Sequence, residues 1–191
     1  MTNEQSRRSE IAALEQEIME KKQELAKLRR TAAPEPIEDY RLKTADGERN
    51  LSEFFAGKQD LLLIHNMGKG CRYCTLWADG INGLRHHLQN RAALLLVSPD
   101  EPQVQQEFAD GRGWEFPLAS GDGSNLAADL GFQKNGKHWP GVSVLRRQAD
   151  GSIVRVSWSY FGPGDSYCVA WDFFDLLPEG PNGWEPQFSY K

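Results

Sequence analysis

A continuous apolar run followed by a short loop and two cysteines is the feature that most constrains the fold. Leu61-Leu-Leu-Ile64 has the length and composition of a central strand buried on both faces. Cys71-Arg-Tyr-Cys74 follows a glycine-containing loop, and the apolar residues beyond it recur at helical spacing. This pattern predicts a strand–loop–helix junction with Cys71 at the N-terminus of the helix. There, free backbone N–H groups and the helix dipole stabilise a thiolate, so Cys71 is the expected nucleophile and Cys74 a more buried, less acidic partner.

The rest of the chain alternates between the signals of strands and helices. Asp150-Gly151, between two alternating runs, is the strongest hairpin signal in the sequence. The predicted elements are strands at 40–42, 61–64, 92–97, 116–118, 142–147 and 153–159, and helices at 51–55, 71–88, 102–108 and 167–177. This order predicts an α/β fold with a central mixed β-sheet flanked by helices. Residues 34–178 are the predicted globular domain, and residues 179–191 are a predicted extended tail.

Residues 1–33 form a distinct N-terminal arm, because they contain no glycine, proline or aromatic residue. Their apolar residues follow a heptad series, interrupted by Lys21, and are Ile11, Leu14, Ile18, Leu25 and Leu28. A helix over Ser9–Arg30 is predicted. Its apolar face fits either the chain's own domain or a second subunit in a coiled-coil homodimer. Two prolines within residues 31–37 predict an extended linker after the helix.

Composition and charge exclude several classes of protein. Lys and Arg total 22 against 27 Asp and Glu, so the formal net charge is −5 and a dominant nucleic-acid role is excluded. No apolar run approaches the roughly 20 residues of a membrane span, and the polar N-terminus lacks the apolar core of a secretory signal. The 3 cysteines, an odd number, argue against a disulfide-stapled secreted scaffold. The expected location is the reducing cytoplasm, where a CxxC pair indicates redox or metal chemistry.

A metal site is disfavoured because the cysteine pair lacks further ligands at suitable spacing. The nearest histidines, His86 and His87, are adjacent in the sequence. Adjacent residues on a helix point about 100° apart, so the two cannot close a site together. They are predicted to lie on a solvated face, and no metal is expected.

Four segments of the body resemble an uncharacterised bacterial family within the thioredoxin-like superfamily. They are Asp46-Gly47 with Leu51–Phe55, Ile64–Asp79 around the cysteine pair, Gly113–Pro117, and Pro140–Val144. That family is described as a domain of unknown function related to the alkyl hydroperoxide reductase and thiol-specific antioxidant group. The resemblance implies a thioredoxin-like fold with an added N-terminal helix, and a redox-active disulfide with no other cofactor.

The resemblance also suggests roles for residues outside the cysteine pair. It implies a cis peptide bond before Pro140, at the start of the strand that faces the active-site helix. The expected substrate groove is bordered by Pro140, Trp139, Arg72 and Tyr73. His65, at the end of the buried strand, is either a hydrogen-bonded core histidine or a group that assists proton transfer from the second cysteine. Cys168 is expected to be a buried structural thiol, with a third redox partner as the alternative.

The leading functional hypothesis is a thiol–disulfide oxidoreductase. Cys71 attacks a disulfide in a protein or small molecule, and Cys74 resolves the mixed intermediate. Lys69 and Arg72 are expected to add positive charge beside Cys71 and lower its pKa. The couple is therefore expected to be more oxidising than thioredoxin at about −270 mV.

Two other functions remain open. A peroxiredoxin-like peroxidase uses a Pro-x-x-x-Thr-x-x-Cys pattern, and neither cysteine has it. Ile64 and Gly68 occupy the Pro and Thr positions before Cys71, and Met67 and Cys71 occupy them before Cys74. The third possibility is a non-enzymatic interaction module, in which the N-terminal helix binds a partner and the cysteines are relics.

Overall fold

The computed structural model describes residues 3–190 and divides the chain into two compact units, Met1–Pro34 and Glu35–Lys191. The first unit is the single helix α1 (Asn3–Thr31), which extends beyond both predicted ends of the Ser9–Arg30 helix. None of its described residues is buried. Its heptad side chains (Ile11, Leu14, Ile18, Leu25 and Leu28) are between 46% and 62% exposed.

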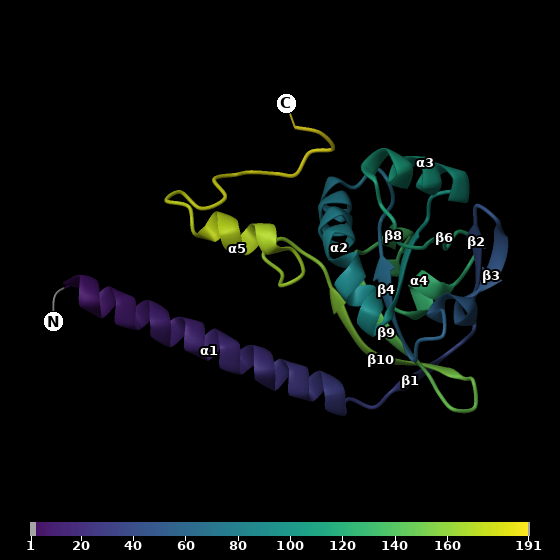
Figure 1. Ribbon diagram of the computed structural model, residues 1–191, viewed down its shortest axis with the longest axis horizontal. Helices are drawn as coiled ribbons and strands as arrows, with labels where there is room; N and C mark the ends of the chain where they lie inside the picture. The colour runs from purple at the N-terminus through teal and green to yellow at the C-terminus, as the bar shows by residue number, and fades with distance from the viewer. Residues whose placement is uncertain (1–2, 191) are drawn as a thin grey trace. The chain divides into compact units, whose positions relative to one another are not determined.

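The second unit is built on an eight-stranded mixed sheet of order β1-β10-β9-β4-β5-β6-β2-β3 (Figure 1). The strands are β1 (Glu35–Ile37), β2 (Arg41–Thr44), β3 (Gly47–Asn50), β4 (Asp60–His65), β5 (Ala93–Ser98), β6 (Leu118–Ser120), β9 (Gly141–Arg147) and β10 (Ile153–Tyr160). β4, β5 and β6 run parallel, and the other neighbouring pairs are antiparallel. A separate small hairpin pairs β7 (Gln133–Lys134) with β8 (Lys137–His138).

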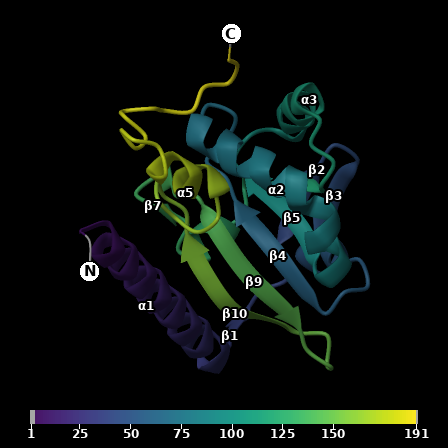
Figure 2. The ribbon, with the colours of Figure 1, turned by 60° about the vertical axis from the view of Figure 1, so that its left-hand side comes forward.

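Helices cover both faces of this sheet. They are the 3₁₀ helix η1 (Leu51–Phe55), α2 (Arg72–Arg91), α3 (Pro102–Arg112), α4 (Leu126–Asp129) and α5 (Val169–Asp175). α2 and α3 connect the parallel strands, and Figure 2 shows α2 crossing one face of the sheet over β4 and β5. The predicted α/β fold with a central mixed sheet is confirmed. In the described part of the chain, no helix is both long and apolar enough to cross a lipid bilayer.

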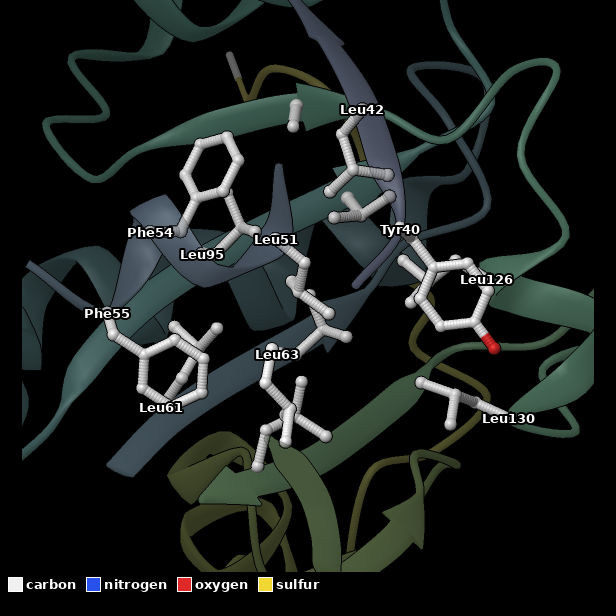
Figure 3. Close-up of a cluster of buried hydrophobic side chains, with 14 of the residues drawn as sticks. Tyr40, Leu42, Leu51, Phe54, Phe55, Leu61, Leu63, Leu95, Leu126 and Leu130 are labelled. Carbon is white, nitrogen blue, oxygen red and sulfur yellow. The ribbon is translucent and has the colours of Figure 1, made fainter. Parts of the chain in front are cut away.

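The central strands alternate their side chains between two hydrophobic cores. On β4, Leu61 and Leu63 enter the core formed with η1, β2 and α4, which Figure 3 shows in close-up. Leu62 and Ile64 enter the core on the opposite face, where Trp77 and other residues of α2 pack against them. Successive side chains of a strand point to opposite faces, so an unbroken apolar run is what a strand covered on both sides requires.

Three segments differ from the prediction. The predicted linker 31–37 contains β1, whose Pro36 pairs with Val154 at the edge of the sheet, where a missing N–H group is tolerated. The strand expected at 116–118 lies instead at β6, two residues later. The last helix is limited to Val169–Asp175, shorter than the predicted 167–177.

The segment predicted as an extended tail packs on the body. The Trp184 ring contacts the rings of Trp171 and Phe174 at centroid distances of 6.1 and 4.7 Å. Pro186 is fully buried, and the Phe188 carbonyl accepts a hydrogen bond from Arg112. These contacts hold the C-terminal segment against α5 and the end of α3.

Candidate active site

The cysteine pair occupies the first turn of α2. Cys71 is the N-cap residue, with an extended backbone (φ −97°, ψ 104°), and Cys74 is the third residue of the helix. The backbone N–H of Cys74 donates to the Cys71 sulfur at 3.1 Å, so the thiol takes the place of an ordinary capping oxygen. Thr75 donates both its N–H and its hydroxyl to the Cys71 carbonyl, which fixes the start of the helix.

The two thiols differ in acidity and burial. The pKa of Cys71 is lowered to about 7, mainly because the Cys74 side chain forms a hydrogen bond with its sulfur. Hydrogen bonds from the backbone N–H groups of Cys74 and Tyr73 lower this pKa further, whereas burial raises it. Cys74 is only 2% exposed, and its pKa is raised by its bond to Cys71 and by burial. All three cysteines are free thiols. An accessible, acidic first thiol therefore lies beside a buried, weakly acidic second one.

The positive charge of Arg72, which was expected to act on Cys71, is paired with Glu185. Its guanidinium Nη2 lies 3.0 Å from Oε2 of Glu185 in the C-terminal segment. The groups that lower the pKa of Cys71 are the Cys74 thiol and the N–H groups of the first helical turn. The expected effect of the helix N-terminus is therefore present, but the expected contribution of the Lys69 and Arg72 charges was wrong. A pKa of about 7 is similar to that of thioredoxin.

The loop between β4 and α2 is held by backbone hydrogen bonds. The Asn66 N–H donates to the Val97 carbonyl, continuing the pairing of the two parallel strands. The Asn66 side-chain oxygen accepts from Gly68 at 2.8 Å. The backbone N–H of Met67 donates a hydrogen bond to the Cys74 sulfur at 3.5 Å. The loop thus provides a donor to the buried sulfur as well as a fixed approach to Cys71.

Asp100 anchors the same loop and was not singled out from the sequence. Its carboxylate accepts from the Lys69 N–H at 2.8 Å and from the Ser98 hydroxyl at 3.1 Å. Gly68 has φ +104°, and a Cβ there would lie 3.0 Å from both Asp100 carboxylate oxygens, so glycine is required. A Ser-Pro-Asp turn directly after the buried strand β5 is the signal that could have identified Asp100.

A small cavity lies behind this loop. It has a volume of about 20 Å³ and is lined by Asn66, Gly68, Lys69, Thr75, Ser98, Asp100 and Gln105 together with four apolar residues. This volume accommodates about one water molecule. The cavity is therefore a place for a bound water and not for an organic substrate.

His65 lies in the core and makes its hydrogen bond away from the cysteine pair. Its Nε2 is 2.9 Å from the Ser143 hydroxyl on β9, and its ring stacks on Phe132 at 3.7 Å. Complete burial lowers the pKa of His65 to about 3, so the ring is neutral at physiological pH. Of the two alternatives for His65, this geometry fits the core histidine.

Trp139 and Pro140 lie at the sheet end from which the active-site loop departs. Pro140 precedes β9, whose first residue, Gly141, pairs with His65 at the end of β4. Trp139 is 52% exposed and is available as a groove wall. The expected cis peptide bond before Pro140 was wrong, because the described chain contains none. The Trp139 N–H donates to Phe132 and the Pro140 carbonyl accepts from Phe161, so both flanks are satisfied in an extended trans segment.

Tyr73 connects the cysteine helix to the C-terminal part of the chain. Its ring lies 6.2 Å from the Trp77 ring and 6.3 Å from the Trp171 ring. Cys168, the N-cap residue of α5, is buried in the same aromatic core, and burial raises its pKa. These properties fit a structural thiol. Sequence reasoning missed the contribution of the C-terminal segment to the surroundings of the site.

No group of three or more His, Cys, Asp or Glu residues within 3–190 is arranged to hold a metal ion. His86 and His87 are both exposed on α2, as expected. The residues described above form a site of two thiols, their backbone N–H donors and the loop between β4 and α2.

Comparison with known protein families identifies the family to which this chain belongs. A family profile described as "Bacterial protein of unknown function (DUF899)" matches residues 2–189. The chain belongs to the DUF899 family. The resemblance inferred from the cysteine motif is thereby confirmed at the level of a bacterial thioredoxin-like family. A comparison of this DUF899 chain with curated proteins finds no match.

Several peroxiredoxins are among the solved structures similar to this DUF899 chain. Peroxidoxin BcpB from Mycobacterium tuberculosis has a TM-score of 0.54 and 22% identity over 73% of this chain and 91% of its own. Reduced Prx3 from Vibrio vulnificus, in complex with hydrogen peroxide, has a TM-score of 0.55 and 14% identity over 71% and 91%. A cysteine-to-serine variant of PrxQ from Xylella fastidiosa has a TM-score of 0.55 and 17% identity over 68% and 85%. At these identities the likeness shows a thioredoxin-like fold.

The thiol of Cys74 should control the pKa of Cys71. Cys74→Ala removes the side-chain donor, so the pKa of Cys71 should rise from about 7 toward its ordinary value. Cys74→Ser keeps a donor and should leave the pKa close to 7. The measurement is the pH dependence of Cys71 alkylation in a Cys168→Ala background. Because only the thiolate reacts, the rate should fall as pH decreases through the pKa, and equal midpoints for the alanine and serine variants would contradict this assignment.

Glu185→Gln should release the charge of Arg72 next to the active thiol. The exposed guanidinium should then lower the pKa of Cys71 by a few tenths, an effect that 1 M salt should remove. Glu179→Gln is the matched control, because it removes the same charge from the same segment but Glu179 bonds to Asn182. The alkylation midpoints of the two variants test this coupling. An identical alkylation midpoint in both variants would show that the Glu185–Arg72 ion pair does not affect the pKa of Cys71.

Proposed function

We propose that this protein is a thiol–disulfide oxidoreductase in which Cys71 is the attacking thiolate and Cys74 the resolving thiol. The observation that supports it is the unequal pair at the start of α2. The Cys71 sulfur is partly exposed and acidic and caps the N-terminus of α2, and the Cys74 thiol is buried. A solvated aromatic, Trp139, and the residues Arg72 and Tyr73 are the proposed border of the substrate groove.

The reaction follows from the two thiols. The Cys71 thiolate attacks one sulfur of the substrate disulfide, forms a mixed disulfide and expels the other sulfur as a thiolate, which takes up a proton. Once the negative charge on Cys71 is gone, its contribution to the high pKa of Cys74 is lost. Cys74 then gives its proton to solvent, attacks the Cys71 sulfur and releases the second substrate thiolate. A dithiol reductant returns the Cys71–Cys74 disulfide to the reduced state.

The cytoplasm is the proposed location, because an odd number of cysteines (3) argues against a disulfide-stapled secreted scaffold. A non-enzymatic module with relic cysteines has less support, because that class predicts a blocked Cys71 and an exposed Cys74. The arrangement is the reverse, since Cys71 is half-buried and Cys74 is buried.

Peroxide reduction is the second candidate, and it is favoured by the peroxiredoxins among the similar structures, one of which contains hydrogen peroxide. Against it, the two registers of the peroxidase pattern place Gly68 or Cys71 where a threonine hydroxyl would bind the peroxide. The Thr75 hydroxyl, on the first turn of α2, donates its hydrogen bond to the Cys71 carbonyl.

Stopped-flow kinetics of the fully reduced protein distinguishes the two reactions. A chromogenic aromatic disulfide should react with Cys71 much faster than hydrogen peroxide at the same concentration, with the rate following the thiolate fraction of Cys71. Peroxide consumption that is faster than disulfide exchange, and that survives in Cys74→Ser with an external thiol, would assign the protein to the peroxidases instead.

A further inference from the structure

α1 carries an apolar stripe that its own unit leaves uncovered. Leu14, Ile18 and Leu25 line a shallow hollow along the helix, bordered by Glu17, Lys21 and Lys22. Ile11 and Leu28 continue the stripe at heptad spacing toward the two ends. Large apolar side chains aligned over most of a helix are typical of a surface that a partner helix covers. We propose that the partner is a second copy of this chain, and that two α1 helices form a parallel, in-register coiled coil.

The charges beside the stripe select a second copy. With Ile11, Ile18 and Leu25 at heptad position a, the g positions are Glu10, Glu17 and Glu24, and the e positions are Glu15, Lys22 and Arg29. In a parallel dimer, a g residue faces the e residue of the next heptad on the partner helix. Glu17 then faces Lys22 of the second copy, and Glu24 faces its Arg29. Two-fold symmetry repeats each attraction, and the like-charged contact is confined to Glu10 against Glu15.

The antiparallel arrangement that keeps the same apolar layers has poorer charge matching. It places Glu17 against Glu24 of the second copy and Arg8 against its Arg29, which are like-charged contacts on both flanks. Its one attractive pair on the flanks joins Glu15 to Lys22. The parallel alignment is therefore the one that the charges favour.

Lys21 limits the strength of this dimer without blocking it. It occupies a d position in the middle of the stripe, and its Nζ lies 3.0 Å from Oε2 of Glu24 on the same helix. The ammonium is thus directed toward the flank, while the methylene groups stay over the apolar seam. A lone polar residue in a seam reduces stability but disfavours shifted registers. A reversible monomer–dimer equilibrium is the expected behaviour.

Sedimentation velocity of the full-length reduced protein at about 1 to 100 µM tests the proposal. The intact protein should shift from monomer to dimer over this range. Glu17→Lys and Lys22→Glu should each weaken the dimer by roughly tenfold, because two attractive pairs become repulsive. An equimolar mixture of the two variants should restore association as a heterodimer, which a misfolded helix could not do. Glu20→Lys and Lys27→Glu, with the same charge changes at outer c positions, are the matched controls.

Glu15→Lys tests the orientation by the sign of its effect. It should strengthen a parallel dimer, where it relieves the contact with Glu10, and weaken an antiparallel one, where it opposes Lys22. Weakening would overturn the parallel arrangement. An intact protein that stays monomeric at about 100 µM, or charge variants that behave like their controls, would overturn the second copy as occupant and assign the stripe to the chain's own body or to another partner.

Discussion

Cys71→Ser is expected to abolish disulfide reduction, and the loss should be on the order of 10³-fold or more, because a serine hydroxyl is not ionised near neutral pH. Cys74→Ser should behave differently in kind. Its Cys71 thiolate should still alkylate rapidly at neutral pH, and it should accumulate a mixed disulfide with the substrate because the resolving thiol is missing. The measurements are insulin-type disulfide reduction, alkylation rates, and mass spectrometry of the trapped adduct.

Cys168→Ser is the control for this pair of variants. Cys168 is buried and its pKa is raised, so its replacement should leave both the alkylation rate of Cys71 and disulfide reduction unchanged. Equal alkylation rates for Cys71→Ser and Cys74→Ser at pH 6 would contradict the assignment, because they would show that the helix N-terminus does not select the first sulfur.

Gly141→Ala is expected to lower the free energy of unfolding by about 3 kcal/mol or more. A Cβ at this position would overlap the Ser159 carbonyl oxygen on β10 and the Phe132 ring, and would lie 3.1 Å from the Tyr160 Cα. Two of these neighbours are backbone atoms of the paired strand, so they cannot move without breaking the β9–β10 register. Chemical denaturation monitored by tryptophan fluorescence measures the change.

Gly83→Ala provides the opposite control. Gly83 lies within α2, and a Cβ there would have no neighbour within 4 Å. Alanine has the higher helix propensity, so this variant should be stabilised by up to about 1 kcal/mol. If Gly141→Ala had the same stability as the unchanged protein, the close packing of β9 against Phe132 and β10 would be contradicted.

Features that depend on local sequence were predicted well. The strand 61–64, the helix that begins at the cysteine pair, and the hairpin around Asp150-Gly151 all formed close to their expected bounds. The acidity of Cys71 belongs to this group, because it arises from a sulfur at a helix N-terminus and from a thiol three residues later. An apolar run, a turn signal and a helix start each act over a few residues, so they can be read without knowing what packs against them.

The surroundings of the site were decided by tertiary structure alone. Glu185 is 113 residues from Arg72 in the sequence, yet its carboxylate forms an ion pair with the Arg72 guanidinium, whose charge was expected to act on Cys71. His65 finds Ser143 and Phe132 across the sheet, Asp100 reaches the active-site loop from the next strand, and Pro140 stays trans between two backbone hydrogen bonds. The sequence by itself determined which thiol is activated, because helix capping is local. The tertiary structure decided which charged and polar groups surround that thiol, because hydrogen bonds and ion pairs form between whichever groups the folded chain brings within about 3 Å.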